Sequence, residues 1–154
     1  MKLNIGDIAP EISGKDQNSN TISLKDFINH KVILYFYPKD STPGCTAEAC
    51  SLRDNYDALM KKGFKIIGVS CDNEASHKKF IDKYNLPFPL IADTDKKIVN
   101  DYGVWGEKKF MGKTYFGVLR TTFVISEAGI IDEIIEKVET KNHAQQILDI
   151  VKNK

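Results

Sequence analysis

Residues 32–54 read VILYFYPKDSTPGCTAEACSLRD, a short apolar run followed by a turn and then a helical pattern. The apolar run, closed by Pro38, is typical of a buried strand. Thr42 is a favourable helix N-cap residue and Pro43 a favourable first helical residue. We therefore expect a buried strand that leads through a short loop into a helix with Cys45 in its first turn.

Apolar runs and helical patterns alternate through the rest of the chain and predict its other elements. Residues 14–20, GKDQNSN, are polar and rich in turn-forming types, so we expect a loop there. We expect strands at 64–70 and 88–92, a helix from Pro43 to a stop at Gly63, and further helices near 74–86, 94–102 and 144–151. Residues 121–126 and 130–135 flank a tight turn at Gly129 and predict a β-hairpin.

This order of elements places the chain in the α/β class. A strand–helix–strand–helix–strand order, then a hairpin and a terminal helix, favours a mixed central sheet flanked by helices. A thioredoxin-like fold has this ending, with a C-terminal β-hairpin and helix. A chain of 154 residues fits one domain over residues 1–154, and it buries enough surface to need no disulfide for stability.

Charge and hydropathy argue against two classes of partner. The 22 basic and 21 acidic residues form no basic stripe, so we expect no nucleic-acid binding. The longest strongly apolar run, VILYFY, is far shorter than a membrane span, so we expect no membrane insertion. The N-terminal MKLNIGDIAP lacks the apolar block and cleavage site of a secretory signal, which favours the cytoplasm.

The three cysteines of the chain favour catalysis or metal binding over structural bridges in such a domain. A metal site is disfavoured, because Cys45 and Cys50 lack a matching second pair and the histidines stand at no ligand spacing. The first turn of a helix presents unpaired N–H groups and the positive end of the dipole, which favour a thiolate. Cys45 is therefore placed to be reactive, although two cysteines on one helix are equally expected as small buried apolar residues.

Cys50 lies five residues after Cys45 on the same expected helix. Five helical steps separate the two Cα atoms by about 8–9 Å. A disulfide requires Cα atoms within about 4.4–6.8 Å of each other. The two sulfurs cannot bond while the helix is intact, so any disulfide between them requires the first turns to unwind.

Arginine is scarce in this chain, since the 22 basic residues are 20 Lys and only two Arg, Arg53 and Arg120. Positions where arginine is kept are candidates for a role that needs a permanently charged fork of donors. Arg53 follows Cys50 by one turn and has Asp54 and Asp57 beside it, so we interpret it chiefly as part of a solvated surface pair, with a supporting role near the reactive cysteine as the alternative.

The segment FYPKDSTPGCTAEACSLRD resembles the active site of peroxiredoxins, in particular the bacterioferritin-comigratory-protein (Q-type) subfamily. The family motif Pro-x-x-x-Thr/Ser-x-x-Cys is matched by Pro38, Thr42 and Cys45, and the step to Cys50 is a feature of that subfamily. Three further stretches agree with the family: GVSCDNEASHKKF, YGVWGEKKFMGKTYFGV and LRTTFVI, the last of which contains Arg120.

The resemblance implies a thioredoxin-type fold and an antioxidant thiol peroxidase that reduces hydrogen peroxide and alkyl hydroperoxides. It implies that Cys45 is oxidised to a sulfenic acid and that Cys50 resolves it as an intramolecular disulfide. It also implies electrons from thioredoxin or a similar dithiol reductant, with no metal or organic cofactor. Since the disulfide would form within one chain, we expect a monomer or weak homodimer.

Negative charge grows on the departing oxygen during peroxide cleavage, and fixed donors stabilise it better than mobile water. By resemblance, the Thr42 hydroxyl and the backbone N–H groups of Gly44 and Cys45 hold the peroxide. The resemblance further implies that Arg120 stabilises the thiolate and the transition state, and that Pro38 shields the pocket from water.

Cys71, His77 and Trp105 have structural explanations that need no part in catalysis. We expect Cys71, at a strand end, to be a packed small residue rather than a resolving thiol, and His77 to be structural or solvated. Trp105 fits either core packing or a substrate pocket.

A general thiol–disulfide oxidoreductase is the alternative enzyme, but Glu48 stands where Cys-x-x-Cys would place its second cysteine. A non-catalytic interaction domain would leave Cys45 inert.

Overall fold

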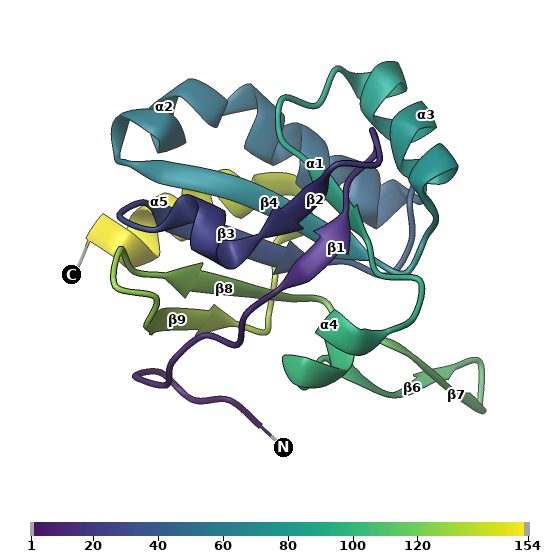
Figure 1. Ribbon diagram of the computed structural model, residues 1–154. Helices are drawn as coiled ribbons and strands as arrows, with labels where there is room; N and C mark the ends of the chain where they lie inside the picture. The colour runs from purple at the N-terminus through teal and green to yellow at the C-terminus, as the bar shows by residue number, and fades with distance from the viewer. Residues whose placement is uncertain (1, 153–154) are drawn as a thin grey trace.

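The computed structural model describes residues 2–152 and has a seven-stranded mixed sheet at its centre (Figure 1). The strand order is β2-β1-β5-β4-β3-β8-β9. The neighbours β3, β4 and β5 run parallel, whereas β8 pairs antiparallel with both β3 and β9. The strands are β1 (Ser13–Lys15), β2 (Thr21–Ser23), β3 (Lys31–Phe36), β4 (Phe64–Ser70), β5 (Leu90–Ala92), β8 (Thr121–Ile125) and β9 (Ile131–Ile135).

Helices cover both faces of this sheet and enclose two apolar cores. One core packs under α1, α2, α3 and α5, and the other under α4, the 3-10 helix η1 and the N-terminal segment. The helices are α1 (Pro43–Asp54), α2 (Tyr56–Lys61), α3 (Glu74–Tyr84), α4 (Lys97–Asp101) and α5 (His143–Lys152), with 3-10 turns η1 (Leu24–Phe27) and η2 (Thr140–Asn142). The predicted α/β class, with a mixed sheet, a C-terminal hairpin and a last helix, is confirmed.

Strand β3 explains why its sequence is apolar without interruption. Ile33 and Tyr35 point into the first core, whereas Leu34 and Phe36 point into the second. Successive side chains of a strand alternate between the two faces, and both faces of this central strand are buried. The run that the sequence predicts as a buried strand is therefore the shared wall of both cores.

The long helix expected from Pro43 to Gly63 is wrong, because it is two helices. The backbone leaves helical geometry at Asn55 (φ −114°, ψ 17°), and the Asn55 amide donates to the Ser51 carbonyl. Asparagine competes for backbone groups in this way, which favours a helix end over a helix interior. The break lets α2 follow a new direction over the sheet (Figure 1).

The helix expected near 94–102 is shorter than predicted, since α4 begins only at Lys97. Lys96 has a positive φ of 63°, which a right-handed helix cannot contain. The buried carboxylate of Asp93 accepts hydrogen bonds from the N–H groups of Ile98 and Val99. A side chain from outside the helix thus satisfies its first turn, and this contact is invisible in local sequence patterns.

Two strand pairs were absent from the sequence prediction. The first is the antiparallel pair of β1 and β2, because residues 14–15 of the expected loop belong to β1. Only the turn after β1 is irregular, and there Asp16 accepts hydrogen bonds from the N–H groups of Asn18 and Asn20. The second pair is a separate hairpin of β6 (Trp105–Phe110) and β7 (Lys113–Val118). Its turn residues Met111 and Gly112 both have positive φ, as a type I′ hairpin turn requires.

Among the described residues, no helix combines the length and apolar character that crossing a bilayer requires.

Gly68 in β4 gives the fold a stringent test. A Cβ atom there would lie 2.6 Å from Leu90 Cδ2 and 2.9 Å from Tyr35 Cζ, inside a packed core. We expect Gly68→Ala to lower the free energy of unfolding by about 1–3 kcal/mol through overpacking. Gly117→Ala is the matched control, because the nearest atom to its Cβ would be on the flexible Lys108 side chain, at 3.3 Å. Denaturant unfolding of both variants measures the difference, and equal stabilities would contradict the packing.

Candidate active site

Cys45 lies in the first turn of α1, as the sequence predicts, and its side chain is buried (1% exposed). Thr42 is the N-cap residue in extended geometry, and the Thr46 N–H donates to the Thr42 carbonyl. The Thr42 side chain does not cap the helix, however. Its hydroxyl donates to the Lys39 carbonyl at 2.8 Å instead, so the first N–H groups of α1 stay free of a side-chain partner from Thr42.

Arg120 contacts Cys45 although the two residues are 75 positions apart in the sequence. Its Nη2 donates to Cys45 Sγ at 3.3 Å, and its Nη1 donates to Glu48 Oε1 at 2.6 Å. The register explains this, because β8 pairs Thr121 with Phe36 at the end of β3, where the loop toward α1 begins. The strand order thus places the residue before Thr121 beside the start of α1.

The guanidinium of Arg120 lies close to the backbone of Gly44. A Cβ atom on Gly44 would lie 3.3 Å from Arg120 Nη2. Burial alone would lower the pKa of Arg120, but the charges of Cys45 and Glu48 reverse this and hold its pKa above the usual value. Arg120 is therefore a permanent cation that serves two acceptors on α1.

Glu48 is the main residue of this site that sequence reasoning missed. Its side chain is fully buried, and its Oε2 has no hydrogen-bond partner while lying 3.5 Å from His143 Nε2. Burial raises the pKa of Glu48 to about 7, and Arg120 only partly opposes this. The available signal was its position three residues after Cys45, on the same face of the helix.

His143, the first residue of α5, closes the site from the other side. Its Nδ1 lies 2.9 Å from Gln146 Oε1 and its Nε2 lies 2.8 Å from Thr122 Oγ1. Burial lowers the pKa of His143 to about 4, so the ring is neutral at pH 7. A neutral ring satisfies both contacts when Nδ1–H donates to Gln146 and Nε2 accepts from Thr122.

The two other cysteines occupy different surroundings, and all three are free thiols. Cys50 is half-buried on α1, which is intact between it and Cys45. Cys71 follows β4 and packs against the core on the sheet face opposite Cys45. Burial, with added repulsion from Asp93, raises the pKa of Cys71 to about 11. A packed and weakly acidic Cys71 agrees with the expectation of a structural residue.

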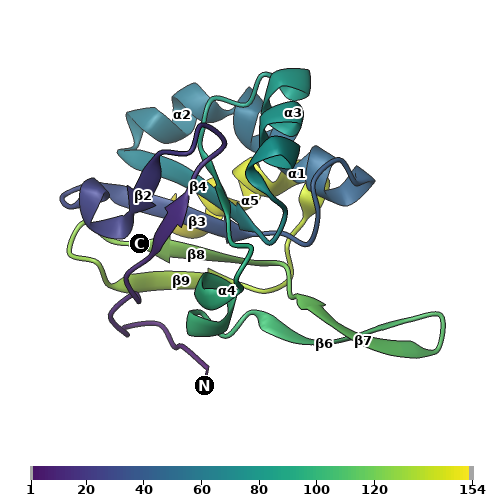
Figure 2. The same ribbon diagram turned by 45° about the vertical axis from the view of Figure 1, so that its right-hand side comes forward.

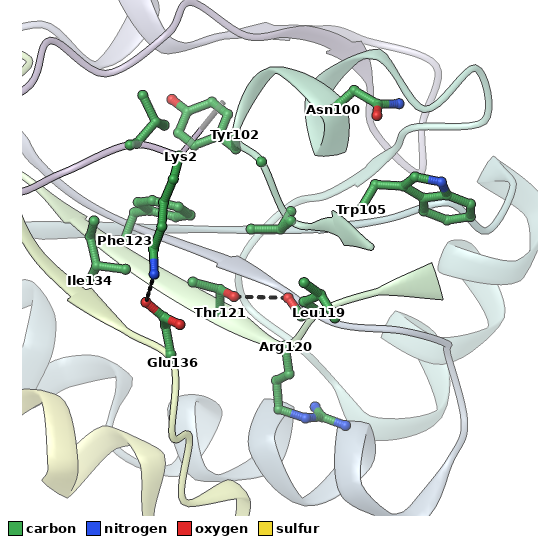
Figure 3. A pocket seen from close by; sticks show the side chains of 13 residues that line it. Lys2, Asn100, Tyr102, Trp105, Leu119, Arg120, Thr121, Phe123, Ile134 and Glu136 are labelled. Carbon is green, nitrogen blue, oxygen red and sulfur yellow. Dashed lines mark hydrogen bonds and ion pairs between the residues drawn. The ribbon is translucent and has the colours of Figure 1, made fainter. Parts of the chain in front are cut away.

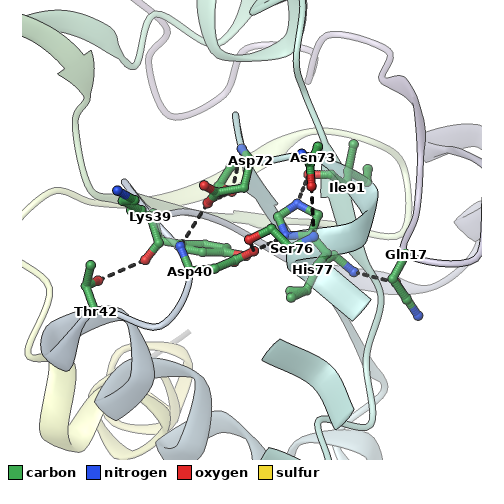
Figure 4. A network of polar contacts seen from close by, with 12 residues as sticks. Gln17, Lys39, Asp40, Thr42, Asp72, Asn73, Ser76, His77 and Ile91 are labelled. Carbon is green, nitrogen blue, oxygen red and sulfur yellow. Dashed lines mark hydrogen bonds and ion pairs between the residues drawn. The ribbon is translucent and has the colours of Figure 1, made fainter. Parts of the chain in front are cut away.

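The loop between β3 and α1 is held by a polar network around Asp40 (Figure 4). The Asp40 carboxylate accepts from Tyr37 Oη at 2.6 Å and Ser76 Oγ at 2.8 Å, and lies 2.7 Å from His77 Nδ1. The Asp40 N–H donates to Asp72 Oδ2 at 2.8 Å. Of the two expectations for His77, structural or solvated, the structural one is confirmed, because the ring is fully buried.

This network brings possible metal ligands together, but each is already engaged. Asp40, Asp72 and His77 place one ligand atom each within 4.8 Å of one another. Both carboxylates accept hydrogen bonds from protein groups, and His77 Nε2 contacts the Ile91 carbonyl at 2.9 Å. The cluster therefore connects the loop between β3 and α1 to α3 through hydrogen bonds.

A cavity of about 550 Å³ adjoins Arg120 but is not where Cys45 lies. Trp105, Tyr102 and Phe123 line it, and the guanidinium of Arg120 points away from these side chains in Figure 3. Trp105 also packs against the second core, under the Lys96 ammonium at 5.4 Å. Trp105 therefore combines core packing with lining a cavity that Cys45 does not line.

Arg53 forms the expected pair with Asp54, with a 2.9 Å contact between Nη2 and Oδ1. Its Nη1 also donates to the Tyr84 carbonyl at 2.8 Å. The second arginine of the chain thus ties the end of α1 to the end of α3, remote from the first turn of α1.

The comparisons with known proteins agree with this geometry. A family model described as AhpC/TSA family matches residues 5–134. The peroxiredoxin Bcp of Escherichia coli strain K12 is 44% identical over 150 residues, which cover 97% of this chain and 96% of the relative. This chain is a peroxiredoxin of the AhpC/TSA family. A Haemophilus influenzae relative named putative peroxiredoxin bcp is 42% identical over 98% of this chain and 97% of its own.

Solved structures place this peroxiredoxin in the same branch. Peroxiredoxin Q of Xanthomonas campestris superposes with a TM-score of 0.86 and 34% identity, covering 92% of this chain and 90% of that one. A cysteine-to-serine mutant of Xylella fastidiosa PrxQ gives a TM-score of 0.92 at 30% identity, covering 99% and 98%. These neighbours confirm the thioredoxin-like fold and the Q-type resemblance. The enzyme is a thiol peroxidase, and the alternative of a non-catalytic domain is excluded.

The raised pKa of Glu48 predicts a pH dependence of stability. The folded peroxiredoxin holds the Glu48 proton more tightly than the unfolded chain does, so stability is lost as pH rises from about 4.5 toward about 7. We expect Glu48→Gln to remove this loss, worth up to about 3 kcal/mol. Urea unfolding at pH 5 and pH 8 measures it.

Glu127→Gln on the exposed turn before β9 is the control for this experiment, because Glu127 is not buried. It should keep the wild-type difference between the two pH values. If Glu48→Gln keeps that difference as well, burial of the Glu48 carboxyl does not govern the pH dependence.

Proposed function

We propose that Cys45 is the peroxidatic nucleophile of this peroxiredoxin and Cys50 its resolving thiol. The Cys45 thiolate attacks the hydroxyl oxygen of R–O–O–H, forming an S–O bond as the O–O bond breaks. The departing R–O⁻ takes up a proton and leaves as R–OH. The sulfenic acid of Cys45 is then attacked by the Cys50 thiolate, which forms the S–S bond and releases the oxygen as water.

The observation that carries this proposal is the pair of donors on Arg120. One nitrogen contacts Cys45 Sγ at 3.3 Å, and the other is held at 2.6 Å by the buried carboxyl of Glu48. The cation is thereby fixed beside the sulfur before any substrate arrives. A fixed positive charge favours the thiolate and stabilises negative charge that develops near it, without reorganisation during the reaction.

Three residues around Cys45 would form the peroxide pocket. Thr42 donates its proton to the Lys39 carbonyl, so its oxygen is free to accept a hydrogen bond from the peroxide hydroxyl. The backbone N–H groups of Gly44 and Cys45 lie in the first turn of α1, where intrahelical acceptors are missing. Pro38, half-buried at the start of the loop, would limit the access of water.

The disulfide step requires α1 to open. Cys45 and Cys50 are five residues apart on an intact helix, about 8–9 Å between Cα atoms, which exceeds the reach of a disulfide. We propose that the first turns unwind after oxidation and refold after reduction. Unwinding would withdraw Cys45 from the core and Glu48 from Arg120.

We further propose that the reaction takes place in a single domain, in a monomer or weak homodimer, and in the cytoplasm. Both cores share the sheet, which supports one domain over residues 1–154. An intramolecular disulfide needs no second subunit, which supports a monomer or weak homodimer. Three cysteines, an odd number in a domain that needs no disulfide framework, fit the reducing cytoplasm, and thioredoxin or a similar dithiol protein would return the two electrons.

Thiol counting tests the assignment of the two cysteines. Equimolar hydrogen peroxide should rapidly remove two thiols from the reduced protein without forming a covalent dimer. Cys71→Ser should still lose two thiols, whereas Cys50→Ser should lose only the Cys45 thiol and fail to turn over with thioredoxin. Undiminished turnover of Cys50→Ser, together with its loss in Cys71→Ser, would assign resolution to Cys71.

The two arginines provide a matched test of the proposed cation. Lysine presents one ammonium, which cannot reproduce the fork that contacts Cys45 and Glu48 at once. We expect Arg120→Lys to slow the second-order reaction with hydrogen peroxide by about 10²-fold, the order found when one fixed donor is lost. Arg53→Lys should react at the wild-type rate, as stopped-flow Trp105 fluorescence or thiol loss can measure. Equal second-order rates for Arg120→Lys and Arg53→Lys would contradict the proposed role of Arg120 in the reaction with peroxide.

A further inference from the structure

The hairpin β6–β7 is a two-stranded sheet that pairs with no other strand among the described residues. It projects from the body of the molecule beyond α4, and Figures 1 and 2 show this from two directions. A two-stranded hairpin is only marginally stable by itself. A projecting element of this kind therefore calls for an explanation beyond the fold.

Exposed apolar side chains gather on this hairpin. Five of the eight large apolar residues that are exposed in the described part of the chain lie on it or just after it: Phe110, Met111, Tyr115, Phe116 and Leu119. Scattered exposed apolar residues are normal, but a concentration of them marks an interaction site.

The strand register divides these side chains between two faces. Directly paired residues of antiparallel strands share a face, and successive pairs alternate. The pairs Phe110–Lys113 and Lys108–Tyr115 therefore lie on one face, which we name the cationic face. The pairs Lys109–Thr114 and Glu107–Phe116 lie on the opposite face. The cationic face carries two aromatic rings and two lysines, and the only carboxylate of the hairpin is on the other side.

The cationic face borders the reaction site. Lys108 Nζ donates to the Val118 carbonyl at 2.9 Å, two residues before Arg120. Burial lowers the pKa of Lys108, Arg120 lowers it further, and the charge of Cys45 raises it. Lys108 therefore lies within electrostatic range of Cys45 and of the Arg120 guanidinium that contacts it. Strand β7 ends at Val118, two residues before Arg120, whose guanidinium contacts Cys45.

We propose that the cationic face of β6–β7 docks the dithiol protein that reduces the Cys45–Cys50 disulfide, and that the docking surface of this reductant is acidic with apolar residues around its redox pair. The inference rests on the proposed function, since it presupposes that disulfide. A thiolate of the reductant attacks one sulfur of the disulfide and releases the other as a thiolate. Its second thiol then displaces the enzyme, so that two electrons pass to Cys45 and Cys50.

The size and the charge of the cationic face favour a protein reductant as its binding partner. A peroxide acts within the pocket at the first turn of α1, so it requires no contact with aromatic rings along a projecting hairpin. A protein reductant must bring its own thiol to the unwound start of α1, and it needs a surface beside that point. Two unopposed lysines steer an acidic partner and raise its association rate, while Phe110 and Tyr115 supply apolar contact area.

The hairpin offers its own matched variants. Phe110 is 66% and Phe116 65% exposed, and they lie on opposite faces. Lys113 and Lys109 differ in the same way. We expect Phe110→Ser and Lys113→Glu each to raise KM for thioredoxin at least about fivefold, measured with thioredoxin reductase and NADPH. Phe116→Ser and Lys109→Glu should leave KM unchanged.

Two further measurements separate docking from chemistry. All four variants should lose two thiols to hydrogen peroxide at the wild-type rate, and dithiothreitol should reduce their disulfides at the wild-type rate. Raising ionic strength from about 50 to about 500 mM should lower kcat/KM for thioredoxin in the wild type, and less so in Lys113→Glu.

Several outcomes would overturn the inference. KM for thioredoxin could be unaltered in Phe110→Ser and Lys113→Glu, or altered equally on both faces. Sedimentation could instead show a wild-type dimer that Phe110→Ser dissociates, which would assign the face to a second copy of this chain. A different result, no thiol loss with peroxide in the wild type, would reject the proposed function itself rather than the docking face.

Discussion

The contact of one guanidinium with two groups on α1 is the interaction on which the site depends. Arg120 is 75 residues from Cys45 in the sequence, and only the pairing of β8 with β3 brings it to the helix start. The same contact sets several requirements around it. Gly44 lets the guanidinium approach the helix closely, Glu48 holds the second nitrogen from its buried position, and His143 closes the space behind Glu48.

Much of this arrangement could be predicted from sequence, because its signals are local. A run of apolar residues, an N-cap threonine and a following proline place Cys45 in the first turn of a helix. The scarcity of arginine also pointed to Arg120. The helix break at Asn55 and the late start of α4 escaped prediction, since each depends on a side-chain contact that competes with helical periodicity.

The residues that sequence reasoning missed share a physical feature, which is dependence on tertiary burial. Glu48 looks like a solvated helix residue until Arg120 and His143 close over it, and His143 looks like a polar helix start. The β6–β7 hairpin was missed for the opposite reason. Alternation of apolar and polar residues is the usual sign of a strand with one buried face, and this hairpin buries no continuous face. Its one local sign was the glycine in its turn.

The intact α1 has a consequence for the energetics of electron flow. Folding of the helix, burial of Cys45 and the contacts of Arg120 all stabilise the dithiol form, and the proposed unwinding would remove them in the disulfide form. Whatever free energy these contacts supply is subtracted from the stability of the disulfide. The reduction potential of the proposed Cys45–Cys50 couple would thereby be raised, as in other dithiol proteins whose reduced form is the stabler one. Refolding of α1 would then drive the enzyme back to its peroxide-ready state at the expense of the donor.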